Sequence, residues 1–182
     1  MKVKVKFVND KAQELYFKAS NSNSIFPFKT FDDDFCYDVV ATSCTEVAPN
    51  VYKYGIGLAF QIQRGWETIQ DGGKGWQRLL RGNPCFFEVH DSPLKLSIDF
   101  RPRSSVWKTG MVLSNSQGTI DENFTGEVSA VFYHIMPNMP KYEIGDKIGQ
   151  IKIGATFPIE FVEVRQLDKT KRGNGGFGST GK

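Results

Sequence analysis

The chain has few cysteines, no long apolar run and no signal-like start, and each absence excludes a class of protein. The three cysteines, Cys36, Cys44 and Cys85, form no CxxC pair and have no histidine cluster beside them, which argues against a disulfide framework and a structural zinc site. No stretch approaches the roughly 18 consecutive apolar residues of a membrane-spanning helix. The start, MKVKVKFVND, lacks the continuous apolar segment of a secretory signal. We therefore expect a soluble cytoplasmic protein, or a host-cytoplasmic one if its source is viral.

The charge of the chain is close to balance. The 23 lysines and arginines face 20 acidic residues, giving a net charge of +3, and no block of like charge is present. Such a mild excess does not require a nucleic-acid partner. With 182 residues, 40% of them hydrophobic and 13% aromatic, the chain can form one domain with a core of its own. We expect a single domain over residues 1–182 that binds neither a membrane nor nucleic acid directly.

Period-two patterning dominates the sequence. In residues 2–8, KVKVKFV, lysines alternate with apolar residues, which predicts a half-buried strand. Similar short runs bounded by turn-forming residues predict further strands, and these are ELYFK, DVVAT, YGIGLAF, LKLSIDF, GMVLS, EVSAVFYHI, IGQIKI and IEFVEV. Many short strands favour an all-β barrel or sandwich of the jelly-roll type. Helix signals are few, and the best is GWQRLLRG at residues 75–82.

Two regions depart from this pattern. Residues 62–95 are less regular and predict an extra hairpin or lobe inserted into the domain. The tail, RGNGGFGSTGK at 172–182, is too rich in glycine to form a core of its own. It superficially matches a phosphate-binding P-loop, but no Ser or Thr follows Lys182 and no helix can follow. Its glycine amides and Arg172 could still bind an anion, and Phe177 could lie on a planar ring, unless the tail is simply disordered.

Two turns carry candidate functional groups. In RPRSSVWKTG, Arg103 stands beside Ser104 and Ser105, a set that offers one guanidinium and two hydroxyls to phosphate oxygens or to a carboxylate. In GTIDENFTGEV, a hairpin brings Asp121 out of a strand end, where it could serve as a general base or near a metal. Each turn could also be an ordinary polar turn, with Phe124 folded back on the core.

Two polar residues interrupt apolar strands. Asp38 is the single charged residue in CYDVVA, so it needs a partner or an edge position. Gln150 interrupts IGQIKI in the same way. Either residue could also be a strand residue that faces solvent.

The order of these segments is more specific than any one of them. YDVVA, PRSS, GTIDENFTGEV, GDKIGQIKI and RGNGGFGSTG together resemble the five motifs of the trimeric dUTP pyrophosphatases (dUTPases), from about residue 35 to the C-terminus. The resemblance implies a jelly-roll-like, distorted β-barrel and a homotrimer whose three active sites are built from all three subunits. Residues 62–95 would be an inserted lobe with no counterpart in minimal members, and 172–182 a flexible lid.

The resemblance also implies the activity. A dUTPase hydrolyses dUTP to dUMP and pyrophosphate, which limits uracil incorporation into DNA and supplies dUMP for dTMP synthesis. Asp121 would orient and deprotonate the water that attacks the α-phosphorus, and Arg103 would steady its carboxylate. Mg²⁺ would bridge the phosphates mainly through water, with Asp38 in its outer shell. The implied substrate-binding residues are Ser104, Ser105, Asn115, Gly118, Phe124, Gln150, Arg172, Gly176, Phe177, Gly178 and Ser179.

Two positions depart from the usual motifs. Phe124 stands where Tyr is most frequent in the family; a phenyl ring keeps the steric floor under the deoxyribose and loses only a hydroxyl. Ser105 replaces the common Gly, which changes the fine geometry of its turn. We expect sugar discrimination and the chemistry to survive both changes.

Two alternatives belong to other classes of function. The dCTP deaminases share the family fold, but their proton-shuttling glutamate corresponds to Val131 here, and a valine cannot move a proton. A non-catalytic nucleotide-binding or partner-binding module could use the tail and the aromatic residues of the insertion. Trp66, Trp76 and the pair Phe86–Phe87 are the residues through which the insertion could recruit a protein partner.

Overall fold

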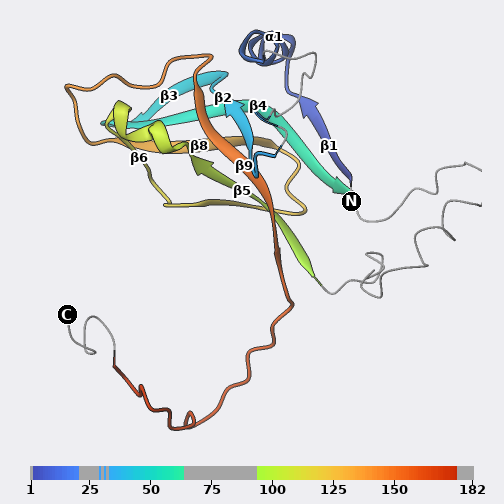
Figure 1. Cartoon of the computed structure of the whole chain (residues 1–182), viewed down its shortest axis with the longest axis vertical. Helices are drawn as coiled ribbons and strands as arrows, with labels where there is room; N and C mark the ends of the chain where they lie inside the picture. Colours follow the sequence, from blue (N-terminus) through green and yellow to red (C-terminus); the bar gives the residue numbers. More distant parts are fainter. Residues whose placement is uncertain (1, 21–28, 30, 32, 64–93, 176–182) are drawn as a thin grey trace, which may run out of the picture.

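Alternating apolar residues form antiparallel strands that assemble into two sheets packed face to face (Figure 1). The computed structural model describes residues 2–20, 29, 31, 33–63 and 94–175. Its strands are β1 (Lys2–Phe7), β2 (Tyr37–Val40), β3 (Ser43–Ala48), β4 (Val51–Gln63), β5 (Lys95–Pro102), β6 (Met111–Leu113), β7 (Gly118–Asp121), β8 (Glu127–His134) and β9 (Lys147–Thr156). Its helices are α1 (Asp10–Ala19) and a short 3-10 helix, η2 (Ser104–Thr109).

The longest strand, β4, organises the first sheet. The sheet has the order β1-β4-β8-β6, and β3 also pairs with β4. The register between β4 and β8 shifts between Gly55 and Ala59, where Gly57 adopts a positive φ of 67°. The Glu127 carboxylate accepts a hydrogen bond from the Gly57 amide at 2.9 Å, which holds this bulge in place.

The second sheet has the order β2-β9-β5-β7, and all of its pairings are antiparallel. Aromatic side chains join it to the first sheet. Phe100 of β5 meets Phe132 of β8 edge to face, with ring centroids 6.3 Å apart. Phe132 in turn contacts the rings of Tyr54 and Tyr142 at 5.9 and 5.5 Å. Such buried rings contribute both apolar area and a defined packing geometry, so they fix how the sheets lie on each other.

Helix α1 overturns one sequence prediction, because ELYFK was expected to be a strand and lies within this helix. The Asn9 side chain caps the helix by accepting a hydrogen bond from the Ala12 amide at 2.9 Å. Burial is confined to Ala12 and Tyr16, four residues apart and therefore on one face of a helix. The Tyr16 hydroxyl accepts a hydrogen bond from the Val40 amide at 3.3 Å, which ties α1 to the end of β2. Burial raises the pKa of Tyr16, so its hydroxyl stays protonated.

A second prediction is also wrong. IEFVEV was expected to form a strand, but residues 157–164 follow β9 without any strand assignment. A strand needs a neighbour for its backbone groups, and this segment leaves both sheets (Figure 1). Its apolar side chains are exposed, Phe161 to 89%.

The insertion expected at 62–95 and the helix expected at 75–82 fall mainly on residues 64–93, outside the described part of the chain. The two ends of the expected insertion belong to strands, because β4 ends at Gln63 and β5 begins at Lys95. Among the helices of the described residues, none has the length and apolar character needed to cross a membrane.

Two glycines that face Phe100 provide a test of the core. A Cβ added at Gly149 would overlap the Phe100 ring and would lie 2.9 Å from the Arg101 carbonyl oxygen, which is backbone and cannot turn away. We expect Gly149→Ala to destabilise the domain by about 2 kcal/mol through overpacking. Gly118→Ala is the matched control, because its Cβ would lie 3.4 Å from the Phe100 Cβ, an ordinary contact. Thermal unfolding followed by circular dichroism compares them, and equal melting temperatures would contradict this packing.

Candidate functional site

The carboxylate of Asp38 lies at the centre of a charged cluster at the edge of the second sheet. Asp38 is 3% exposed. It lies 3.3 Å from Arg103 Nε and 3.2 Å from Lys147 Nζ, and it accepts a hydrogen bond from Gln150 Nε2 at 3.1 Å. These four residues are called the Asp38 cluster below. Burial of a carboxylate costs free energy unless such donors are present. The sequence predicted that Asp38 needs a partner or an edge position, and the structure gives it both, because β2 is an edge strand.

Strand register explains how the cluster forms. Asp38 on β2 pairs with Gln150 on β9, which pairs in turn with Arg101 on β5. Because paired residues share a sheet face, the end of β5 delivers Arg103 to the same place. Sequence reasoning found Asp38, Arg103 and Gln150 but missed Lys147. The signal was present, since Lys147 precedes Gln150 by three residues in the same motif.

A pocket of about 470 Å³ adjoins the Asp38 cluster. Its volume falls in the range of roughly 300–1,000 Å³ typical of small-molecule sites. The lining residues are Ala19, Arg103, Ser105, Lys108, Thr109, Tyr142, Gly145, Asp146 and Lys147. Three of them are cationic and one is acidic, and the carboxylate of Asp146 already accepts a hydrogen bond from the Glu143 amide at 2.7 Å. The pocket therefore favours an anion with several oxygen atoms.

A second group of predicted site residues gathers around β7. Asn115 lies in the turn before this strand, and Asp121 is its last residue. The Phe124 amide donates to the Asp121 carbonyl oxygen at 3.0 Å, so a tight turn follows Asp121. The carboxylate of Glu122 accepts a hydrogen bond from the Leu96 amide at 3.2 Å and anchors this turn to β5.

The side chains of Asn115, Asp121 and Phe124 in this second group are exposed. Asp121 is exposed, and Phe124 is 46% exposed with its ring folded over Gly126, rather than buried in the core. Asn115, Gly118, Asp121 and Phe124 are called the β7 group below. The arrangement offers an accessible carboxylate next to an accessible aromatic ring, which suits a general base beside a bound ring.

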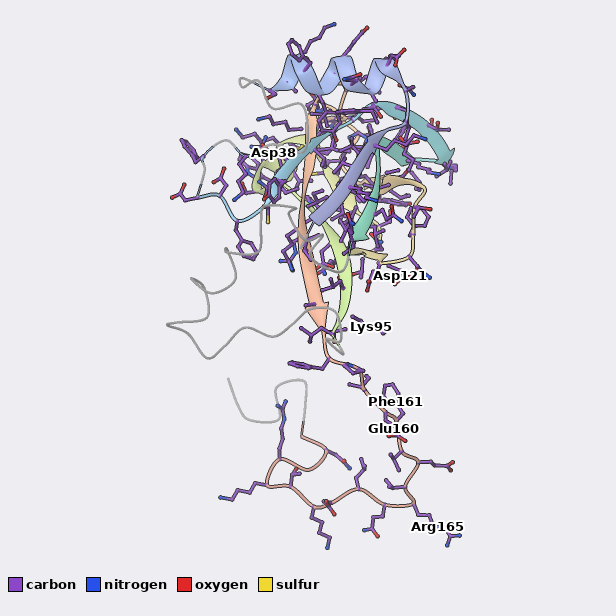
Figure 2. The ribbon with its side chains drawn as sticks, turned by 90° about the vertical axis from the view of Figure 1, so that its right-hand side faces the viewer. Asp38, Lys95, Asp121, Glu160, Phe161 and Arg165 are labelled. Atoms are coloured by element: carbon purple, nitrogen blue, oxygen red, sulfur yellow. The ribbon has the colours of Figure 1, made fainter. Side chains whose placement is uncertain are left out.

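The Asp38 cluster and the β7 group lie at opposite edges of one sheet. Asp38 is on β2, and Asp121 is on β7, three strands away. Asp121 pairs with Ser97, whereas Asp38 aligns through Gln150 with Arg101, four residues further along β5. Strand spacing and rise then separate the two carboxylates by roughly 20 Å. Figure 2 shows Asp38 and Asp121 on different sides of the domain.

This separation bears on the role expected for Arg103. Its ion pair within the described chain is with Asp38, and none is formed with Asp121. A single chain therefore does not bring Arg103 to the carboxylate that it was expected to steady.

The tail contributes one described site residue. Arg172 is exposed, and its Nε donates to the Gly175 carbonyl oxygen at 2.8 Å. The predicted contacts of Gly176, Phe177, Gly178 and Ser179 lie outside the described residues.

The donor set suits a metal that arrives with its ligand rather than one caged by protein. Within the described residues, no group of three or more His, Cys, Asp or Glu side chains gathers in a way that could hold a metal ion. The Asp38 carboxylate already has three donors, two of them cationic. Mg²⁺ is commonly held by waters and substrate phosphates with one or two carboxylates, so an outer-shell role fits these residues.

Comparisons with known sequences agree with the motifs. A sequence model of the dUTPase family matches residues 95–181. A deoxyuridine 5'-triphosphate nucleotidohydrolase of Helicobacter pylori (strain Shi470) is 42% identical over 71 residues, 39% of this chain, and the chain spans about half of that relative, 49%. The enzyme of the same name from Hydrogenobaculum sp. (strain Y04AAS1) is 39% identical over 58% of this chain and 72% of its own length. The enzyme of the same name from Nautilia profundicola is 27% identical over 93% of this chain and 99% of its own length.

Solved structures show the same fold. A mutant dUTPase of Staphylococcus bacteriophage 80alpha with dUpNHpp matches with a TM-score of 0.61 at 17% identity, over 100% of this chain and 99% of that one. The dUTPase of Streptococcus mutans matches with a TM-score of 0.56 at 18% identity, over 86% and 98%. The motifs, the Hydrogenobaculum relative and the mostly β fold agree, and the chain belongs to the dUTPase family.

Proposed function

We propose that this protein hydrolyses dUTP to dUMP and pyrophosphate, as its family membership implies. The observation that carries the proposal is the cationic pocket beside the Asp38 cluster, which suits a polyphosphate. The reaction would limit uracil incorporation into DNA and supply dUMP for dTMP synthesis. We place it in the cytoplasm, with dUTP as the small-molecule substrate.

We further propose that the active site forms between chains of a homotrimer. Asp38 and Asp121 lie roughly 20 Å apart in one chain, too far to act on one phosphate group. In a closed symmetric ring, the β7 group of one chain can face the Asp38 cluster of the next. Arg103 would then meet Asp121 across the interface.

The exposed apolar side chains of residues 157–167 support this assembly. Phe157, Phe161 and Leu167 are 72–89% exposed, far more than an isolated chain should leave in water. A neighbouring subunit would cover them, and the tail would thereby reach another subunit's site. Each subunit would be one jelly-roll-like, distorted barrel that spans the chain and carries the 62–95 insertion.

The chemistry needs a base, an oriented phosphate and charge compensation. The oxygen of the water would attack the α-phosphorus while Asp121 takes a proton from that water. The bond between the α-phosphorus and the oxygen of the leaving pyrophosphate would break at the same time. Asp38 fixes the orientation of Arg103 and Gln150. Arg103 would then steady the Asp121 carboxylate, while Gln150 and the hydroxyls of Ser104 and Ser105 would bind phosphate oxygens. Bound Mg²⁺ would offset phosphate charge, with Asp38 in its outer shell.

Base and sugar selection would belong to the β7 group. Asn115 and Gly118 border the turn that we expect to bind uracil, and the exposed ring of Phe124 would form the floor under the deoxyribose. A 2'-hydroxyl would collide with that floor. Residues 172–182 would close as a lid, Arg172 on the γ-phosphate and Phe177 on the uracil, with the glycines and Ser179 of the tail along the nucleotide.

Substrate selectivity tests the proposed reaction directly. We expect pyrophosphate release in the presence of Mg²⁺ from dUTP, and none from dTTP, dCTP or UTP, because the base pocket and the Phe124 floor reject them. Ammonia is measured in parallel with dCTP. Val131 lies on β8 and cannot carry protons, so ammonia release would contradict the assignment and favour a deaminase.

Mixing two inactive variants tests the site between chains. We expect Arg103→Gln and Asp121→Asn to abolish turnover separately. When the two chains are co-refolded in equal amounts, about a quarter of the interfaces would combine an intact Arg103 with an intact Asp121, so about a quarter of the wild-type rate should return. Each variant refolded alone is the control. A mixture as inactive as its components would argue that each site lies within one chain.

Removal of the Asp38 charge tests the cluster. Asp38→Asn leaves Arg103 and Lys147 close together without a counter-charge, so we expect a loss of about 3 kcal/mol and a melting temperature lower by roughly 6–12 °C. Asp33→Asn, at an exposed aspartate outside the cluster, is the matched control. Calorimetric melting of both variants provides the measurement. Equal melting temperatures would show that Asp38 does not hold the cluster together.

A further inference from the structure

The hydroxyl of Tyr142 is the unexplained buried polar group of the described chain. Tyr142 is 8% exposed, and its hydroxyl has no hydrogen-bond partner among the described residues. The remainder of the residue is well held. Its ring contacts the rings of Tyr54 and Phe132, and its carbonyl oxygen accepts a hydrogen bond from the Tyr54 hydroxyl at 3.0 Å. A phenylalanine at this position would make the same ring contacts, so packing in the core does not explain the hydroxyl.

Three polar residues that act on this hydroxyl also line the pocket beside the Asp38 cluster. They are Thr109, Arg103 and Asp146. The Thr109 hydroxyl is turned elsewhere, donating to the Val106 carbonyl oxygen at 2.6 Å. Burial raises the pKa of Tyr142, so the phenol keeps its proton at neutral pH and can act as a donor. A buried donor at the wall of a cationic pocket is suited to an anionic oxygen.

Lys108 provides a further cation on the same pocket. It belongs to η2, and its Nζ lies 5.6 Å from the centroid of the Trp107 ring, a cation–π contact. Arg103 and Lys147 are shared between the pocket and the Asp38 cluster, whereas Gln150 belongs to the cluster alone. The pocket is therefore lined by the two shared cations and not by Gln150, the residue expected beside the α-phosphate.

We propose that Tyr142 and Lys108 bind the two terminal phosphates of the nucleotide, the group that leaves as pyrophosphate. The proposal rests on the proposed function and adds two residues that the motifs do not assign. The Tyr142 hydroxyl donates to a phosphate oxygen, and Lys108 opposes the charge that develops on the leaving group. The α-phosphate remains beside Gln150, so a monophosphate does not reach this pocket.

Calorimetric titration of the full-length protein tests the subsite with two probes, inorganic pyrophosphate with Mg²⁺ and dUMP. We expect Tyr142→Phe to weaken pyrophosphate binding about fivefold, as loss of one hydrogen bond does, and Lys108→Met to weaken it by about tenfold, as loss of a charged partner does. Binding of dUMP should change less than about twofold in either variant. Lys11→Met, at an exposed lysine near the start of α1 outside the pocket lining, is the matched control.

A melting curve of Tyr142→Phe separates binding from a merely structural role. Because the hydroxyl has no hydrogen-bond partner among the residues that the structure describes, its removal should leave the melting temperature unchanged or raise it. Wild-type pyrophosphate affinity in Tyr142→Phe, or equal weakening for both probes with a lower melting temperature, would overturn the proposal. Turnover of dUTP without pyrophosphate binding would overturn the subsite but not the function. Pyrophosphate binding that depends on Tyr142, in a protein that does not turn over dUTP, would overturn the proposed function but not the subsite.

Discussion

The contact of the Asp38 carboxylate with its two cationic partners is the interaction on which the rest of the site depends. The carboxylate is buried on a four-residue edge strand, and it is stabilised by donors from the end of β5 and from two positions of β9. The dependence is mutual, because Arg103 and Lys147 lie close together only where a negative charge offsets their repulsion. One carboxylate between two cations leaves a positive excess. That excess suits the surface to a polyphosphate.

The second sheet also keeps the two halves of the site apart. Between the Asp38 cluster and the β7 group, the same face carries a closed ion pair, with Lys152 Nζ 3.0 Å from the Asp99 carboxylate. Burial alone would raise the pKa of Asp99, but hydrogen bonds from Lys152 and Ser97 hold it below its usual value. This pair therefore adds no net charge to the face between the Asp38 cluster and the β7 group.

Most of the strands could be predicted from the sequence, because period-two alternation is a local property. The candidate site residues came from turn chemistry and from the resemblance to the family, and their roles stay predictions. Sequence reasoning mistook ELYFK for a strand because Leu15 and Phe17 alternate with polar residues, whereas the cap at Asn9 and the buried pair of Ala12 and Tyr16 decide the helix. It could not foresee that Arg103 pairs with Asp38 or that Tyr142 lines a pocket. Both facts depend on which strands become neighbours, and no local pattern records that.

The extended segment after β9 has a consequence for the lifetime of the protein in a cell. Figure 2 shows Phe161 well away from the two sheets, on a backbone that no strand protects. Proteases and chaperones recognise such exposed, apolar, extended chain. In the homotrimer proposed above, this segment would be covered, so an unassembled subunit would be cleared while an assembled one persists. The abundance of the protein would then follow its state of assembly, with no separate degradation signal required.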